Sequence, residues 1–237
     1  MVWPGWEGAE PAAARDLRER LAARGLAVPA LQAILFARPD LHVFGDAASR
    51  DGLVAHVARV ARLAAALGAK AMVFGSPRNR LRGAMAAEAA MAAAVPVFRA
   101  MGAACHDAGT SLAIEANPVE YGGDFLTRWS DAAELVARVD HPGIVLHLDT
   151  ACTALAGDDP VAAVAACASG IGHFHVSAPQ LGPVDGGNDI AHPAIAAALR
   201  AGGYGGWVSI EMRRTATPLD SVRAAAEFVA RCYGDAP

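Results

Sequence analysis

The sequence predicts an α/β protein built around a parallel sheet, and three observations carry that prediction. The chain has 237 residues, a length within the range of one α/β barrel domain. Its hydrophobic fraction of 54% excludes a disordered chain, although 58 of the residues are alanine, which favours helix more than it fills a core. Short apolar runs alternate with longer Ala/Leu/Arg/Glu segments, which is the pattern of repeated strand–helix units.

Six short runs rich in β-branched or bulky apolar residues are the predicted strands; they cover residues 28–35, 71–75, 111–116, 144–148, 171–177 and 207–211. Segments of helical composition lie at about 10–24, 50–68, 81–108, 130–139, 158–169, 190–202 and 217–233. Several of these helices end at a glycine just before the next strand, as helix C-termini commonly do. No linker divides the chain, so we expect one domain over residues 1–237.

Two architectures fit such a sheet, a doubly wound sheet and a (β/α) barrel. The doubly wound sheet needs a glycine-rich phosphate-binding turn after an early strand, and the sequence has none. A barrel places functional residues at the carboxyl ends of several strands, and polar residues end four of the predicted strands. The sequence therefore predicts an α/β, TIM-barrel-like (β/α) fold with parallel strands, six of the usual eight being present in this chain.

The charge pattern excludes several partners and chemistries. The net charge is −4 and the 20 basic residues form no basic block, so we expect no nucleic-acid partner. Lys70 is the only lysine and no GxxxxGK[ST] motif precedes it, which argues against a lysine Schiff base and a P-loop.

Cysteine usage and the apolar runs bear on location. The four cysteines lie far apart without a CxxC pair, which is typical of reduced thiols in a cytosolic protein. The first residues lack the basic and apolar regions of a signal peptide. The longest weakly polar run, 83–98, contains Glu88 and is too short and too mild to cross a bilayer. We therefore expect a cytoplasmic protein without a membrane partner.

Ionisable side chains close four of the predicted strands. Three strands end in a carboxylate and one in an imidazole pair: the residues are Glu115, Asp149, the pair His173 and His175, and Glu211. In a barrel these ends converge near the axis, where three carboxylates repel one another unless a cation lies between them. A single acid at a strand end is usually a helix N-cap or a solvated loop residue, but capping does not explain four such strands. We interpret the set as a metal site.

The donor atoms narrow the choice of metal. Three carboxylates and one imidazole nitrogen are mostly hard ligands, which suit Mn²⁺ or Mg²⁺ best and are compatible with Co²⁺, Fe²⁺ or Zn²⁺. Alternate strand residues share a face, so His147 lies on the face of Asp149, and His173 on that of His175. We expect one imidazole of the second pair to bind the metal and the other to lie one layer deeper. His147 and His173 are each either a hydrogen-bonded core histidine, which is the interpretation we favour, or a metal ligand.

Further polar residues near the strand ends are candidates for substrate contacts; they are Arg78, Arg80, Asn117, Cys152 and Arg213. Arginines at these positions could bind a phosphate or carboxylate group, or could be solvated or salt-bridged loop residues. Asn117 is either a substrate contact or a turn-forming residue before proline. Cys152 is either a small packed residue or a soft contact near the metal. Gln32 is either a structural amide or a substrate contact.

Five short motifs extend this pattern over most of the chain, from about residue 3 to the C-terminus. They are GAKAMVFGSPRNR at 68–80, LAIEANP at 112–118, LHLDT at 146–150, HFHVS at 173–177 and VSIEMR at 208–213. In this order and spacing they resemble the sugar phosphate isomerase/epimerase superfamily, the xylose isomerase-like TIM barrels.

The resemblance implies one divalent metal ion held by Glu115, Asp149, His175 and Glu211, with Glu115 and Glu211 also as the acid/base pair. It implies a metal-dependent isomerase or epimerase of a sugar, a sugar phosphate or a related hydroxy-carbonyl compound. In that chemistry the metal polarises the substrate carbonyl and one carboxylate removes the adjacent proton, which gives an enediolate. Reprotonation then gives the epimer or the isomer.

Three positions depart from the ketose 3-epimerases of this superfamily. Those enzymes carry a substrate-binding His three residues after the ligand Asp, where this chain has Cys152. They carry a Glu six residues after the first ligand Glu, where it has Tyr121, and an Arg six residues after the ligand His, where it has Leu181. An inosose-dehydratase-like lyase, a non-catalytic metal- or ligand-binding barrel and an endonuclease-IV-like AP endonuclease are therefore alternatives.

The resemblance also concerns the number of strands. In relatives, the segment that resembles residues 3–10 follows the second barrel strand, so we expect the first two strands to be absent here. Either the sequence begins late, or these units were lost, or a partner chain covers the gap in the wall. Because six strands leave open edges, a stable protein of this kind is expected to be a homodimer or higher homo-oligomer.

Overall fold

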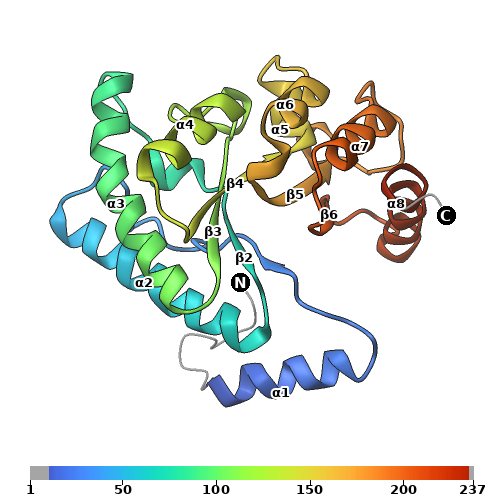
Figure 1. The fold of residues 1–237 in the computed structure, drawn as a ribbon, viewed down its shortest axis with the longest axis horizontal. Helices are drawn as coiled ribbons and strands as arrows, with labels where there is room; N and C mark the ends of the chain where they lie inside the picture. Colours follow the sequence, from blue (N-terminus) through green and yellow to red (C-terminus); the bar gives the residue numbers. More distant parts are fainter. Residues whose placement is uncertain (1–10, 235–237) are drawn as a thin grey trace.

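The computed structural model describes residues 11–234, which form a curled sheet with helices around its outer side (Figure 1). Six parallel strands follow one another in chain order across the sheet. They are β1 (Ala30–Leu31), β2 (Ala71–Phe74), β3 (Ser111–Glu115), β4 (Ile144–Asp149), β5 (Ile171–Ser177) and β6 (Val208–Glu211). The prediction of a TIM-barrel-like fold with six parallel strands is confirmed.

Eight α-helices are found in the described part of the chain. They are α1 (Pro11–Ala22), α2 (Ala47–Leu67), α3 (Ala87–Asp107), α4 (Trp129–Val139), α5 (Thr150–Leu155), α6 (Pro160–Cys167), α7 (His192–Ala201) and α8 (Pro218–Tyr233). Four 3-10 turns follow strands or helices: η2 (Pro77–Arg80), η3 (Val119–Tyr121), η4 (Ala168–Gly170) and η5 (Pro179–Leu181).

Two helical segments differ from the prediction. The helix expected at 81–108 begins only at Ala87, because Gly83 takes a left-handed φ of +57° and the Asp124 carboxylate accepts its N–H at 2.9 Å. The sequence does not predict α5, which begins directly after β4. Its N-cap is Asp149, whose side chain accepts a hydrogen bond from the Cys152 N–H at 2.7 Å.

The core lies between the sheet and the helices. Phe74 of β2 contacts Phe98 of α3 edge-on, with ring centroids 5.3 Å apart. On length and composition alone α3, with 21 residues, could cross a membrane, whereas the sequence predicts that the shorter run at 83–98 is too short and too mild for this. The core helix of a folded protein passes the same test. In the structure Phe98 and Met101 of α3 are fully buried, as in a helix that packs on a sheet.

The described sheet has two edge strands, β1 and β6. β1 has two residues instead of the predicted 28–35 and pairs with β2, while β6 pairs with β5. Among the described strands, β1 and β6 therefore each have one neighbour. Residues 3–10, on which the expectation of missing strands depends, lie outside the described residues.

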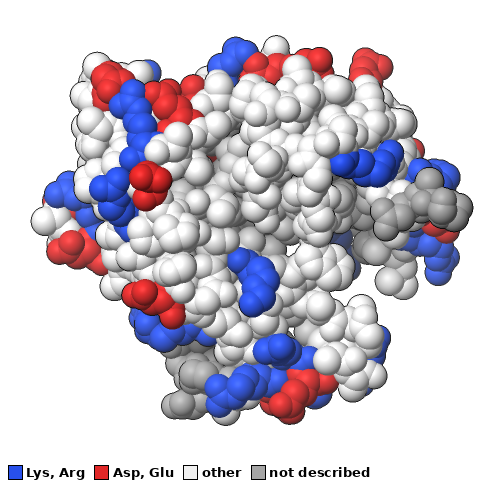
Figure 2. All heavy atoms as spheres, viewed as in Figure 1, with Lys and Arg blue, Asp and Glu red and all other residues white. Residues whose placement is uncertain are grey.

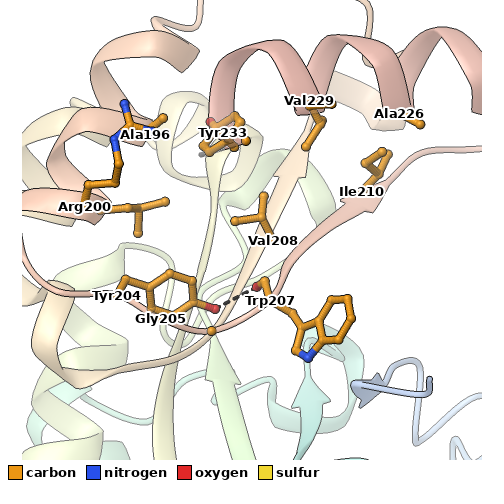
Figure 3. A pocket seen from close by; sticks show the side chains of 14 residues that line it. Ala196, Arg200, Tyr204, Gly205, Trp207, Val208, Ile210, Ala226, Val229 and Tyr233 are labelled. Atoms are coloured by element: carbon orange, nitrogen blue, oxygen red, sulfur yellow. Dashed lines mark hydrogen bonds between the residues drawn. The ribbon is translucent and has the colours of Figure 1, made fainter. Parts of the chain in front are cut away.

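The β6 end of the sheet is less covered than its centre. All four residues of β6 are half-buried, whereas β2 is buried throughout. α8 buries only Ala225 completely. A groove of about 710 Å³ runs between β6, α7 and α8, and Tyr204, Trp207 and Tyr233 line it (Figure 3). Trp207 is 60% exposed, so a large apolar surface lies next to the open edge.

Charged side chains lie scattered over the face seen in Figure 2, with wide neutral areas between them. This arrangement agrees with a chain in which 20 basic and 24 acidic residues are spread along the sequence. The absence of a nucleic-acid partner stays a prediction.

Candidate metal centre

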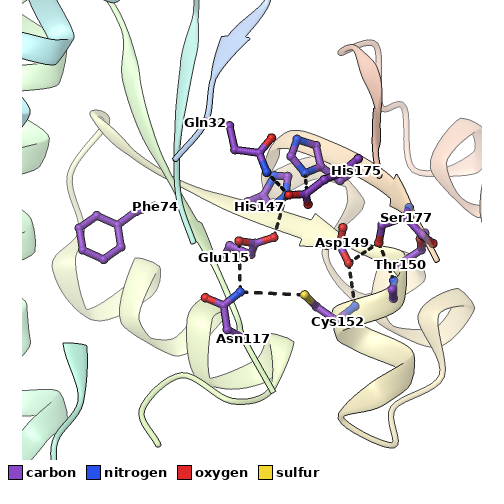
Figure 4. A network of polar contacts seen from close by, with 12 residues as sticks. Gln32, Phe74, Glu115, Asn117, His147, Asp149, Thr150, Cys152, His175 and Ser177 are labelled. Carbon is purple, nitrogen blue, oxygen red and sulfur yellow. Dashed lines mark hydrogen bonds and ion pairs between the residues drawn. The ribbon is translucent and has the colours of Figure 1, made fainter. Parts of the chain in front are cut away.

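The carboxyl ends of four adjacent strands bring one cluster of ionisable groups together. Glu115 ends β3, Asp149 ends β4, His175 lies near the end of β5 and Glu211 ends β6. The sheet register sets Asp149 beside His175. One candidate ligand atom of each residue lies within 4.8 Å of the others, and Figure 4 shows how the buried members meet.

Asp149 presents one free oxygen to this cluster. Its Oδ1 accepts the N–H of Cys152 at 2.7 Å and the hydroxyl of Ser177 at 2.7 Å. Its Oδ2 is buried and has no hydrogen-bond partner in the structure. A buried carboxylate oxygen is stable only beside a compensating group, so the free Oδ2 fits a cation ligand. Asp149 thus combines the N-cap role with an oxygen available to a metal.

Glu115 is 5% exposed, and neighbouring side chains contact both of its carboxylate oxygens. Nδ2 of Asn117 donates to its Oε2 at 3.3 Å, and Nε2 of His147 lies 3.6 Å from its Oε1. Gly75, just after β2, leaves the space that this carboxylate occupies. A Cβ at that position would overlap Oε2 and lie 2.9 Å from the carboxylate carbon.

Arg80 lies behind Glu115 as a fully buried cation. Its guanidinium donates to the carbonyl oxygens of Phe74 at 3.0 Å and Glu115 at 2.6 Å, and to Oδ1 of Asn117 at 2.8 Å. Burial lowers the pKa of Arg80 to about 10, against the influence of the Glu115 charge, so it stays cationic at neutral pH. The substrate contact predicted for Arg80 stays a prediction, but these donors serve the chain itself and orient Asn117.

Glu211 closes the cluster from the last strand. Its Oε2 lies 3.3 Å from Nδ1 of His175, and its Oε1 accepts a hydrogen bond from Nε2 of Gln32, which follows β1. The bond from Gln32 links the two edge strands of the described sheet. The Glu211 side chain is 22% exposed and that of His175 is 3% exposed, so Glu211 is the more accessible to a substrate.

Burial and mutual repulsion set the protonation of the metal-free cluster. Burial raises the pKa of Glu115 to about 8, and the charges of Asp149 and Glu211 add to this. Burial also raises the pKa of Asp149. Burial alone would lower the pKa of His175, but its hydrogen bond to Glu211 and the nearby carboxylates raise it above the ordinary value. The cluster therefore holds protons that a cation would replace.

Two histidines lie beneath the cluster, as the alternation of strand residues predicts. The rings of His147 and His173 are stacked with centroids 5.5 Å apart, and the His147 ring lies 4.3 Å from that of His175. Burial lowers the pKa of His147 far below its ordinary value and that of His173 to about 4, so both are neutral. Both histidines are buried, as expected of core residues, but neither ring nitrogen of His147 nor Nε2 of His173 has a hydrogen-bond partner of normal geometry among the described residues. The main chain of His173 acts on His147 and counteracts part of the lowering of its pKa.

The other candidates surround the cluster with different exposure. Arg78 and Arg213 are exposed, on the turns after β2 and β6, and the Arg213 N–H donates to the Leu181 carbonyl at 2.9 Å. Cys152 is buried, with Sγ 4.0 Å from Nδ2 of Asn117. The structure thus brings Asn117 and Cys152 to the cluster, whereas the side chains of the two arginines are exposed and make no hydrogen bond or ion pair with it among the described residues.

Two supporting residues are absent from the sequence prediction. Gly75 appears there only as the end of a strand, and no sequence signal shows that a carboxylate fills the place of its side chain. Ser177 had a signal, because it lies two residues after His175 on the same face of β5.

Strand–helix units around a cluster of strand-end carboxylates define a (β/α)-barrel protein with a metal-type site. A family model described as "Xylose isomerase-like TIM barrel" matches residues 3–232, and the chain belongs to this family. The resemblance drawn from the sequence motifs is confirmed. A comparison with curated protein sequences gave no match.

Three solved structures illustrate the likeness of fold. L-Ribulose 3-epimerase superposes with a TM-score of 0.79 at 18% identity, over 98% of this chain and 82% of that chain. A 3-keto-D-glucoside 4-epimerase from E. coli gives a TM-score of 0.78 at 17% identity, over 94% and 86%. The IOLI protein with a binding zinc atom gives 0.76 at 18% identity, over 97% and 84%. At these identities the likeness concerns the fold.

Proposed function

We propose that the protein is a divalent-metal-dependent isomerase or epimerase of a sugar, a sugar phosphate or a related hydroxy-carbonyl compound. The observation that carries this proposal is the cluster of Glu115, Asp149, His175 and Glu211, whose candidate ligand atoms lie within 4.8 Å of one another. Two of the structurally similar proteins are sugar epimerases by name, which supports a carbohydrate-like substrate.

The four residues of the cluster would hold one ion, with Mn²⁺ or Mg²⁺ best suited to their mostly oxygen donors. Such an ion supplies polarisation of the substrate carbonyl, which acidifies the adjacent C–H bond. Two hydrogen bonds to Oδ1 of Asp149, from the Cys152 N–H and the Ser177 hydroxyl, would orient its Oδ2 toward the ion.

Glu115 and Glu211 would move the proton. They come from the outer strands of the cluster, β3 and β6, so the substrate carbon would lie between them. One carboxylate would take the proton next to the carbonyl, and the other would return a proton to the same or the neighbouring carbon. Arg78 and Arg213, both exposed, are candidates for binding a phosphate or carboxylate group of the substrate.

The test is solvent deuterium uptake. Protein loaded with Mn²⁺ is incubated in D₂O with a panel of ketoses, ketose phosphates and hydroxy-keto acids, and loss of the α-proton signal is followed by NMR. We expect exchange in at least one compound, and a loss of about 10²–10⁴-fold in Glu211→Gln, the usual contribution of an acid/base group. The variant's retained metal content is the control that separates proton transfer from metal binding.

The other outcomes identify the alternatives. Loss of water from an exchanging compound would indicate an inosose-dehydratase-like lyase. Incision of abasic DNA would indicate an AP endonuclease. Tight metal binding without exchange in any compound would contradict the proposal and favour a non-catalytic binding barrel.

A further inference from the structure

We propose that Glu115, His147 and His175 form a second, deeper metal position in this protein, which binds Zn²⁺ in preference to Mn²⁺ or Mg²⁺. Two of the three ligands belong to the cluster already described, so this inference rests on the proposed metal centre. The third, His147, has no part in the proposed reaction.

The geometry of His147 carries the inference. It lies on β4 two residues before Asp149, so its side chain enters the same interior one layer deeper. Candidate ligand atoms of Glu115, His147 and His175 all lie within 4.8 Å of one another. The rings of His147 and His175 are nearly perpendicular, at 81°, with centroids 4.3 Å apart.

The distance between His147 and Glu115 fits two ligands of one ion. Nε2 of His147 lies 3.6 Å from Oε1 of Glu115, which is too long for a hydrogen bond. Tetrahedral zinc with Zn–N and Zn–O bonds of about 2.1 Å places its ligand atoms about 3.4 Å apart. A small movement of either side chain therefore suffices to bind an ion between them.

His147 is also a buried polar group without a good partner. It is 1% exposed, and neither ring nitrogen makes a hydrogen bond of normal geometry. Buried polar atoms in folded proteins nearly always have a partner, because an unmatched one costs free energy. A ligand bond to an ion would satisfy the nitrogen that faces Glu115.

The two overlapping donor sets differ in chemistry. Two imidazoles and one carboxylate are the ligands of many zinc sites, whereas three carboxylates and one imidazole favour harder ions. Both sets use Glu115 and His175, so one ion is held at a time. The identity of the metal would thus decide how deep the ion lies and whether Asp149 and Glu211 bind it.

The first test uses the parent protein alone. After chelator treatment, one equivalent of Zn²⁺ is added and X-ray absorption at the zinc edge counts the imidazole ligands. We expect two imidazoles. A single imidazole would overturn the proposal, since the set with Asp149 and Glu211 contains only His175.

The second test compares affinities for Zn²⁺ and Mn²⁺ by competition with a chromophoric chelator. We expect His147→Leu to weaken Zn²⁺ binding by at least about tenfold while Mn²⁺ binding changes by less than about twofold, since even an outer partner of a metal ligand is worth tenfold or more. Asp149→Asn should weaken Mn²⁺ more than Zn²⁺. His173→Leu removes the stacked neighbour in the same layer and is the matched control, with both affinities retained.

Equal losses for both metals in His147→Leu, or none for Zn²⁺, would overturn the deeper position and return His147 to the role of a core histidine. Neither result touches the proposed function, which stands or fails on Mn²⁺ binding and deuterium exchange in the parent protein.

Discussion

At the scale of single residues, three carboxylates lie close together in the site, and the chain places the buried cation Arg80 next to Glu115. The buried guanidinium of Arg80 lies behind Glu115 and orients Asn117, while the space in front of Glu115 is bounded by Asp149 and Glu211. Such an arrangement fixes the carboxylates in advance, so that binding an ion requires little movement.

The raised pKa of Glu115 predicts a pH-dependent stability of the metal-free protein. The folded protein keeps this proton up to a pKa of about 8, against an ordinary value of 4.5, so between these values the folded state binds more protons than the unfolded state. The stabilisation of the folded state that comes from protonated Glu115 is therefore fully present below pH 4.5 and is lost as the pH rises through 8. We expect the melting temperature of the metal-free protein to fall between pH 6 and 9. Glu115→Gln should flatten the dependence of melting temperature on pH. Glu120→Gln changes an exposed neighbour and is the control, which should keep that dependence. An unchanged dependence in Glu115→Gln would contradict a buried proton on Glu115.

Gly75 predicts a separate effect on metal binding. Gly75→Ala introduces a methyl group into the space of the Glu115 carboxylate and should displace it, at a cost of about 1–3 kcal/mol of unfolding free energy, typical of overpacking. Metal affinity measured by calorimetry should fall. Gly170→Ala is the matched control, because a Cβ there meets no atom within 4 Å. Unchanged metal affinity in Gly75→Ala would show that Glu115 is not a ligand.

The sequence predicts the members of the cluster but not their supports. Glu115, Asp149 and Glu211 can be chosen because each follows an apolar run and ends a strand. The roles of Gly75 and Arg80 depend on contacts between β2 and β3, which come from the three-dimensional packing of the strands and leave no local pattern.

At the scale of elements, all strands except β1 are predicted to within one residue at each end. The predicted and observed ends of β5 agree, and those of β2, β3, β4 and β6 differ by one residue, because short apolar runs bounded by turns mark these strands. β1 is much shorter than predicted, because the edge of an open sheet offers it one neighbour. α5 was missed because a six-residue helix has too little periodicity to detect.

The bond from Gln32 to Glu211 joins the first and last strands of the described sheet, so a change beside β1 is expected to alter Glu211 at the end of β6. Gln32→Leu removes the donor, so Glu211 should become more mobile and metal affinity should fall, by up to about tenfold because the amide is exposed. Hydrogen exchange should show faster exchange of the β6 amides. Gln180→Leu, the other exposed glutamine, is the control; equal behaviour of the two variants would count against a link between the sheet edges.

At the scale of the whole molecule, the β6 edge, which is less covered than the centre of the sheet, predicts self-association. Trp207, Leu219 and Val222 are 60%, 82% and 56% exposed. Trp207 lines the groove beside β6, and Val222 lines a second pocket that shares Ile210 with this groove, so exposed apolar side chains gather near β6 and α8. We expect light scattering at micromolar concentration to give at least twice the mass of one chain. Val222→Asp should shift the protein toward monomer, and Val119→Asp, which changes another exposed valine, on η3, should not. A monomeric parent protein would refute the prediction.

The link between Gln32 and Glu211 has a consequence for how the protein loses function. The end strands of an open sheet are its least protected elements and unfold locally before the centre does. Because the site draws Gln32 from one end and Glu211 from the other, local unfolding at either end weakens it while β2 to β5 stay folded. The working lifetime of the site is therefore set by the weaker of the two ends of the sheet, and inactivation on warming should precede the loss of helical structure.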